Sequence, residues 1–333
     1  MKRKIISLFL ALAVLLSAAP AVMAESYLTD GALAYVVYDD HAQLVKCNIG
    51  AESVNILSWI GTKPVTSIAD RAFSGCEKLV SVSIGNNVTN IGERAFSNCA
   101  KLQSVTMQPG VTDIGKRAFE NCSALENITI PDSVISIGSG AFINCGRLQS
   151  VDIPEGITVI RRGTFENCRD LQRVVIGNNV NWIGTRAFYG CESLTQIDIP
   201  DSVTEIGEKS FQKSGLVEIT IPESVRTIRR EAFSNCGALK KAVVGGGVKN
   251  IREWAFYSCD SLENVEFKDG VTTSIGKYMF AGCGALKKVI IPKSVDNIKE
   301  KAFFGCDNVT FYVSPDSYAE RYAANNGFNY IVQ

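Results

Sequence analysis

Phenylalanine recurs at a nearly constant spacing along most of the chain, and other apolar residues hold fixed places around it. Successive Phe residues are 23 positions apart, except for one interval of 22 and one of 24. A Val/Ile-x-x-Ile pair precedes each Phe, and a Cys followed by Leu-x-x-Val-x-Ile comes after most of them. The Phe positions are 73, 96, 119, 142, 165, 188, 211, 233, 256, 280 and 303. This regularity predicts a repeat protein.

Each repeat predicts one coil of a solenoid. In Val-x-Ile, for example Val82 and Ile84, apolar and polar residues alternate as in a strand with one face inward. Pro, Gly, Asn or Ser then supplies a turn. One coil cannot bury its own apolar face, so identical coils must stack at the strand spacing of about 4.8 Å. Eleven coils predict a mainly β repeat solenoid roughly 50 Å long, with helix confined mainly to the first residues and the C-terminal end.

The repeat from Val111 to Pro131 resembles the 23-residue leucine-rich repeat of the BspA-like surface proteins, and the match recurs eleven times over residues 65–313. The resemblance implies a right-handed leucine-rich repeat stack with an N-terminal β cap and a short C-terminal helical cap. We expect a signal peptide at residues 1–24, the N-terminal cap at 25–62, the solenoid of about eleven repeats at 63–313 and the C-terminal cap at 314–333. Two irregularities interrupt the spacing: one residue is missing between Ser214 and Leu216, and one is added near Thr272 and Thr273.

The first 24 residues have the pattern of a secretory signal. A basic start precedes an apolar stretch from Ile5 to Leu16, and small residues lead to Ala24. The apolar stretch is shorter than the roughly 20 residues that a membrane span requires, and a membrane-anchor helix is the competing interpretation. We expect a secreted or cell-surface protein with no membrane span after the signal is removed.

Charge excludes one class of partner. The chain has 34 Lys and Arg against 34 Asp and Glu, and three of the basic residues lie in the leader. The remaining chain has 31 basic and 34 acidic residues, a net charge of −3. A nucleic-acid-binding protein would show a basic excess and a basic stripe, so we expect no nucleic-acid partner.

Ten of the eleven cysteines lie three residues after a repeat Phe, and Ser214 takes this place in the remaining repeat. A small apolar thiol suits a core, so we expect a ladder of buried, reduced cysteines. Disulfides between neighbouring coils are the alternative, because coil spacing alone does not exclude them. The eleventh, Cys47, lies off the ladder, and we expect it to be buried in the cap.

The sequence predicts neither catalysis nor a cofactor. His41 is the only histidine, and it lies in an expected hairpin turn beside Asp39 and Asp40. No Cys-x-x-Cys pair predicts a zinc site, and no Gly-rich phosphate loop is present. Asp152 and Asp198 lie two repeats apart, too far for a paired-carboxylate glycosidase, which stays a remote alternative. We therefore expect no enzyme, no metal and no cofactor.

Two other surface features have alternative interpretations. Basic residues recur just before the Ala-Phe pairs, either as a docking stripe for anionic glycans or as a solvated charge column offset by neighbouring carboxylates. They are Arg71, Arg94, Arg117, Arg186, Lys209 and Lys301. Aromatic residues at non-core positions could form an interaction patch or pack locally. They are Trp182, Tyr189, Trp254, Tyr257 and Phe304.

The expected binding surface is the outer face of the Val-x-Ile strands. The residue before Val and the residue between the two apolar ones point away from the core, because side chains alternate across a strand. The first three coils carry small neutral residues there, whereas charged and apolar residues appear together from the fourth coil onward. The candidate partner-binding residues are Asp152, Arg173, Val175, Asp198, Glu218, Lys241, Val243, Glu266, Lys288 and Ile290. The competing interpretation is that the Val and Ile residues merely suit a strand.

These features together predict a non-enzymatic binding protein. Repetition builds an extended, rigid surface suited to large partners, and the resemblance implies adhesion to host matrix proteins or to other cells. We expect an extracellular protein or glycan partner and a monomeric chain. The alternative is a structural or self-assembling component of the cell envelope.

Overall fold

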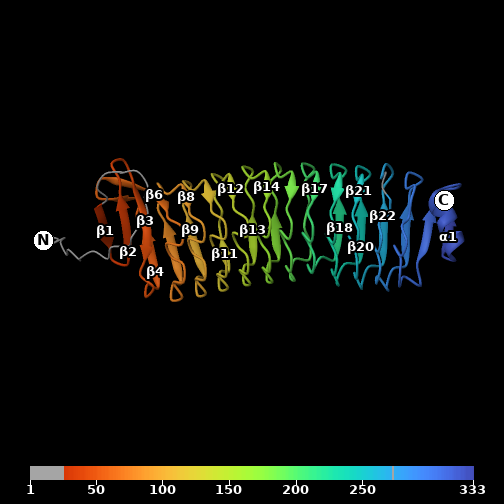
Figure 1. The fold of residues 1–333 in the computed structure, drawn as a ribbon, viewed down its shortest axis with the longest axis horizontal. Helices are drawn as coiled ribbons and strands as arrows, with labels where there is room; N and C mark the ends of the chain where they lie inside the picture. Colours follow the sequence, from red (N-terminus) through yellow and green to blue (C-terminus); the bar gives the residue numbers. More distant parts are fainter. Residues whose placement is uncertain (1–25, 272–273) are drawn as a thin grey trace, which may run out of the picture.

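The chain forms a rod of stacked coils, with the first strands at one end and a single helix at the other (Figure 1). The computed structural model describes residues 26–271 and 274–333. The expected signal peptide and the added residue near Thr272 and Thr273 therefore lie outside the described residues. The predicted β-solenoid is confirmed. It has about 13 turns, more than the eleven Phe repeats, because strands before and after the repeats continue the stack.

An antiparallel meander begins the rod. β1 (Ser26–Asp30) pairs with β2 (Leu33–Val37), which pairs with β3 (Ala42–Cys47). β3 then pairs in parallel with β6 (Lys63–Ile68), which also carries the antiparallel β5 (Trp59–Ile60). The meander thus covers the first coil and begins the parallel stack. The boundaries of the two caps stay predictions.

The Val/Ile-x-x-Ile segments form the short-strand face of the rod, and its strands after β6 have two residues each. The first ladder continues from β6 through β8 (Asn90–Ile91), β10 (Asp113–Ile114) and β12 (Ser136–Ile137). The second contains β14 (Val159–Ile160), β16 (Trp182–Ile183), β17 (Glu205–Ile206), β19 (Thr227–Ile228) and β21 (Asn250–Ile251).

The Val-x-Ile segments form the opposite long-strand face, which is divided into two parallel sheets. The first sheet contains β4 (Ser53–Ile56), β7 (Ser81–Ile84), β9 (Ser104–Met107), β11 (Asn127–Ile128), β13 (Ser150–Asp152) and β15 (Arg173–Val175). The second contains β18 (Glu218–Ile221), β20 (Lys241–Val244), β22 (Asn264–Phe267), β23 (Lys288–Ile291), β24 (Thr310–Val313) and β25 (Asn329–Val332). Residues 196–199 lie between the two sheets and form no strand.

The Phe residues form one continuous column along the core. Ring centroids of successive Phe residues from Phe73 to Phe303 are 4.5–5.6 Å apart, and most rings are nearly parallel. Strand pairing in register, for example Ser81 opposite Ser104, places equal repeat positions above one another. The column crosses the interruption of the long-strand face unbroken, since Phe188 and Phe211 are 5.4 Å apart. One core therefore joins the two sheets.

The cysteines form a second column beside the Phe rings. From Cys99 to Cys306, each ladder thiol donates a hydrogen bond to the Phe carbonyl oxygen of the preceding coil, with Sγ–O distances of 3.1–3.2 Å. All eleven cysteines are free and buried, which confirms the predicted thiol ladder and the buried place of Cys47. Ser214 continues the column, with its Oγ 3.3 Å from the Sγ of Cys236.

Helix α1 (Tyr318–Asn326) closes the C-terminal end. The Ser317 hydroxyl accepts a hydrogen bond from the Glu320 N–H at 3.1 Å, which caps the first turn. Gly327, with φ of 73°, ends the helix in a left-handed conformation. The sequence predicts a helix over residues 317–325 of the cap, one residue earlier at both ends than the structure places it. β25 then returns alongside β24.

Candidate functional site

The long-strand face presents the two outward columns that the sequence predicts. Strand burial alternates, as in β18, where Glu218 and Thr220 are exposed and Ile219 and Ile221 are buried. All ten candidate residues, from Asp152 to Ile290, lie at exposed or half-buried positions of this face. Their role in binding a partner stays a prediction.

Two of the candidate charges neutralise each other. The Arg173 guanidinium donates to the Asp152 carboxylate across adjacent strands, with an Nη1–Oδ1 distance of 2.6 Å. Val175 stands directly opposite Asp152 on the next strand and is 44% exposed. An exposed apolar side chain beside an ion pair gives this end of the surface a mixed character, which suits protein contacts.

The C-terminal candidates are less exposed than the sequence indicates. Val243 and Ile290 point outward but are half-buried, so Val175 is the most exposed of the three apolar candidates. Lys288 places its Nζ 4.4 Å from the ring centroid of Tyr312, a cation–π contact. Glu266 accepts a hydrogen bond from Lys268 at 2.6 Å.

A hollow of about 650 Å³ opens where the long-strand face is interrupted. Ile197 and Ile199 lie on one side of it and β18 lies on the other. Three carboxylates line it, from Asp198, Asp201 and Glu218. Within residues 26–271 and 274–333, these three carboxylates have no Lys, Arg or His nitrogen within 4 Å. The hollow thus gathers three carboxylates, and Lys241 stands directly opposite Glu218 on the next strand, β20.

A missing residue in the next coil lies beside the interruption. Cys191 and Leu194 are three positions apart in one coil, whereas Ser214 and Leu216 are only two apart in the next. The shortened turn lies so close to the previous coil that a Cβ on Gly215 would be 2.0 Å from the Glu192 carbonyl oxygen. The turn before β18 is therefore one residue shorter than the turns of the regular coils.

The basic column on the opposite edge is largely paired. Arg94 and Arg117 both contact Glu120 at 3.4 Å, Arg186 contacts Glu166 at 3.3 Å, and further along Lys209 contacts Glu231 at 3.5 Å. Glu120 lies three residues after Arg117 in the same coil, and the other three pairs join residues of adjacent coils. Most of these ion pairs therefore connect neighbouring coils at the surface. Carboxylates thus offset most of the column, as the second interpretation expects.

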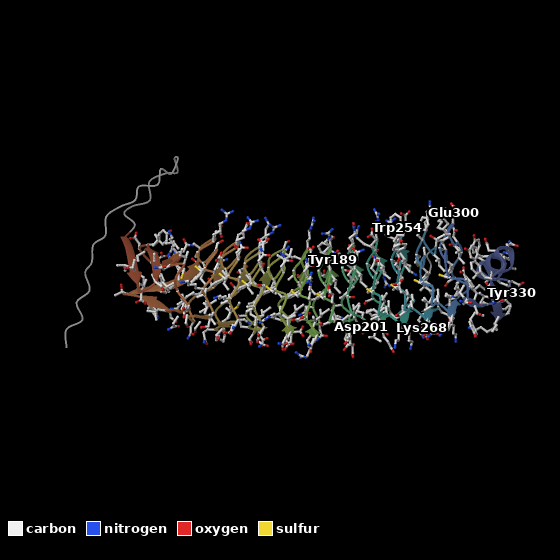
Figure 2. The ribbon with its side chains drawn as sticks, turned by 90° about the horizontal axis from the view of Figure 1, so that it is seen from below. Tyr189, Asp201, Trp254, Lys268, Glu300 and Tyr330 are labelled. Carbon is white, nitrogen blue, oxygen red and sulfur yellow. The ribbon has the colours of Figure 1, made fainter. Side chains whose placement is uncertain are left out.

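Aromatic rings on the same edge are stacked with cations. Arg230 lies 4.2 Å from the Trp254 ring centroid, and Trp254 stacks on Tyr278 at 6.0 Å. Tyr278 is absent from the sequence-based aromatic set, although it stands two residues before Phe280 just as Trp254 stands two residues before Phe256. Trp254 lies on the edge opposite Asp201 (Figure 2), so this cluster and the hollow are separate surfaces.

Little in the described chain supports catalysis by histidine or metal binding. His41 stacks on Tyr38 at 4.5 Å, and its Nδ1 is 2.6 Å from the Asp40 carboxylate, a hydrogen bond that lowers the pKa of Asp40. Across residues 26–271 and 274–333, no three His, Cys, Asp or Glu side chains are grouped so that they could hold a metal ion. Helix α1 is too short to cross a membrane, and no other described helix could do so.

Comparison with known proteins agrees with this architecture. The profile of the BspA-type leucine-rich repeat region, in six copies, matches residues 66–195 and 181–310. The chain belongs to this family. A BspA-type repeat accounts for the coil length, the Phe column and the Leu that follows each turn.

Solved structures extend the likeness over nearly the whole BspA-type chain. A leucine-rich cell surface protein of Faecalibacterium prausnitzii is 31% identical with a TM-score of 0.59, covering 93% of this chain and 95% of the other. A leucine-rich repeat protein of Bacteroides ovatus is 23% identical with a TM-score of 0.56, covering 94% and 99%, a likeness that shows the fold alone. No curated protein matches the chain.

Proposed function

We propose that this BspA-type protein is a secreted, non-enzymatic adhesion protein that presents its long-strand face to an extracellular protein or glycan. The long-strand face carries the proposal. Its inward side chains fill the core, whereas its outward residues from Asp152 onward mix charged and apolar groups that the core does not require. The similar F. prausnitzii structure is that of a cell surface protein, which supports a place outside the cytoplasm. A rigid solenoid with such a face suits binding to large partners.

The test replaces four outward residues by the Ser and Thr found in the first coils. We expect the combined changes Asp152→Ser, Arg173→Ser, Val175→Thr and Asp198→Thr to weaken capture of the partner at least about tenfold, because they remove the charged and apolar contacts together. Thermal stability should change little, since an exposed ion pair contributes only about 0–1 kcal/mol. Immobilised matrix proteins and glycans would be screened with the wild-type chain first, and the variant would then be titrated against each ligand found.

A matched control changes four exposed residues of the same types elsewhere on the rod: Asp132→Ser, Ile135→Thr, Arg147→Ser and Asp170→Thr. The control should bind like the wild type. Equal binding by both variants would move the site away from the long-strand face.

A second candidate function, self-assembly, is favoured by the last strand. β25 pairs only with β24 among the described strands, and Tyr330, Ile331 and Val332 on it are 41–47% exposed. An open apolar edge strand is a template for pairing with another chain. Sedimentation over a range of concentrations should give a monomer if adhesion is the function. A polymer that Ile331→Lys disperses would support assembly instead.

A further inference from the structure

A second hollow, of about 470 Å³, lies on the edge of the rod opposite Asp201, and three aromatic rings line it (Figure 2). Its lining residues are Arg230, Glu231, Asn235, Trp254, Tyr257 and Tyr278. They come from three successive coils of the stack. This aromatic hollow shares no residue with the strands of the long-strand face.

Two of its rings stand where the turn itself does not require them. Trp254 and Tyr278 lie two residues before the Phe of their coils, with φ of 58° and 57°. This left-handed conformation is uncommon for bulky residues. Gly140 and Gly163 hold the same place in two other coils, with φ of 65° and 62°. Since Gly suffices for the turn, the two rings need another reason.

Contacts between coils hold these two rings in place. Arg230 of the preceding coil lies 4.2 Å from the Trp254 ring centroid, and Tyr278 of the following coil stacks on Trp254 at 6.0 Å. Beyond them, the Lys277 and Lys301 ammonium groups are 5.4 Å and 5.9 Å from the Tyr278 centroid. Both faces of the indole are therefore occupied within the chain, and the stacked pair forms a rigid wall of the aromatic hollow.

Tyr257 offers the free ring face. It is 40% exposed and directly follows Phe256. Ser234 and Ala281 hold the same repeat position in the two adjacent coils, so only small side chains flank the ring along the rod. In the part of the chain that the structure describes, no other ring or cation stacks on Tyr257. A flat ligand therefore has room to pack on it.

Asn235 adds an available carboxamide. Asparagines at the same repeat position of earlier coils hydrogen-bond to one another in a row, with N–O distances of 2.7–2.9 Å. They are Asn98, Asn121, Asn144 and Asn167. Lys213 and Ser258 flank Asn235 instead, and the Asn235 side chain is exposed, with no hydrogen-bond partner among the described residues. Its donor and acceptor groups are free for a ligand.

The charges that line the aromatic hollow offset each other. Glu231 Oε1 is 3.0 Å from Arg230 Nε, and Glu231 Oε2 is 3.5 Å from the Nζ of Lys209, outside the lining. The other lining residues are uncharged. This lining favours an uncharged ligand that has both an apolar face and hydroxyl groups, because a wholly apolar one would leave the Asn235 carboxamide unpaired.

We propose that the aromatic hollow binds a neutral pyranose sugar of a glycan, whose C–H face packs on the Tyr257 ring and whose hydroxyls bond to the Asn235 carboxamide and the Glu231 carboxylate. Rigid apolar walls with a few placed polar groups are the usual composition of a small-ligand site, and sites of roughly 300–1,000 Å³ are typical. An aromatic ring supplies a large contact area at its face. The inference goes beyond the proposed function and does not rest on it, because none of the residues changed in that test lines the aromatic hollow.

The probes are neutral tetrasaccharides of glucose, galactose, mannose and N-acetylglucosamine, titrated one at a time into the full chain with isotope-labelled Trp. We expect at least one to bind saturably, with a Kd of about 1 mM or tighter, and to shift the indole N–H resonance of Trp254. Trp59 is the internal control, since it is 54% exposed and lies near the N-terminal end of the rod. Its resonance should not move.

Two variants separate the ring contact from the hydrogen bonds. Tyr257→Ser, which copies Ser234 of the preceding coil, should lower the affinity for the bound tetrasaccharide at least about tenfold. Asn235→Gly should lower it at least about threefold, and Gly190 already holds that repeat position with φ of 69°. The matched control is Tyr189→Ser, at the repeat position of Tyr257 three coils earlier, which should bind like the wild type.

Three outcomes would overturn the inference: no saturable binding of any of the tetrasaccharides, undiminished binding by Tyr257→Ser, or equal shifts at Trp59 and Trp254. Acidic sugars form the last arm of the test. Binding confined to them and lost in salt would also contradict the inference, since it assigns the contact to Lys277 and Lys301 rather than to the ring of Tyr257. Failure of partner capture with intact sugar binding contradicts the proposed function alone.

Discussion

Raising the pH above 9 is expected to destabilise the rod steeply. Cys122, Cys145, Cys168 and Cys191 are fully buried, and burial raises the pKa of each thiol above its ordinary value of 9.0. Above pH 9 the unfolded chain loses these protons while the folded chain keeps them, so stability falls as pH rises. Each thiol contributes about 1.4 kcal/mol per pH unit, and the four together contribute at most roughly 5.6 kcal/mol per pH unit.

The measurement is the thermal midpoint between pH 8 and pH 10 with a reductant present. A variant with all four thiols replaced by Ser should show a much flatter pH dependence, because Ser does not ionise in this range and Ser214 already occupies the column. Identical slopes for the two proteins would mean that the thiol ladder does not control alkaline unfolding.

Truncating one ring of the Phe column is expected to have the other large effect. Phe142 is fully buried, with ring centroids 5.3 Å from Phe119 and 5.4 Å from Phe165. Phe142→Ala should lower the free energy of unfolding by about 3–5 kcal/mol, since it leaves a cavity between two rings. Denaturant titration followed by circular dichroism measures this loss.

Phe304→Ala is the matched control. Phe304 is 64% exposed and lies beside the buried Phe303, so its truncation should change stability by less than about 0.5 kcal/mol. A loss below about 1 kcal/mol for Phe142→Ala would show that neighbouring coils close the cavity.

The repeat pattern predicts most of the fold because the same repeat positions pack in the core of every coil. The positions of Phe73, Cys76 and Leu79 follow from the spacing, and all three are buried. The alternation of Val82 and Ile84 also predicts which side chains face out. Local periodicity is sufficient to predict which side chains are buried, since every coil contacts only its neighbours.

The candidate site was less predictable because it depends on contacts between coils. The Asp152–Arg173 pair requires the register of β13 and β15, and sequence columns do not show diagonal neighbours. The missing residue before Leu216 is visible in the sequence, whereas the loss of strand pairing one coil earlier, at Gln196 to Ile199, is not. An irregular turn is thus easily recognised, whereas the place where the sheet opens depends on the whole stack.

The direction of the bonds between coils determines how the rod responds to force. These bonds run from coil to coil along its length, for example from the Phe96 N–H to the Ala118 carbonyl at 2.7 Å and from the Phe119 N–H to the Ala141 carbonyl at 2.8 Å. Tension between the two ends therefore acts on every coil boundary at once, and the weakest boundary gives way first. Each coil of 23 residues that peels away extends to roughly 80 Å in place of about 4.8 Å of rod. A rod held at both ends would lengthen in nearly equal steps and absorb work at each one.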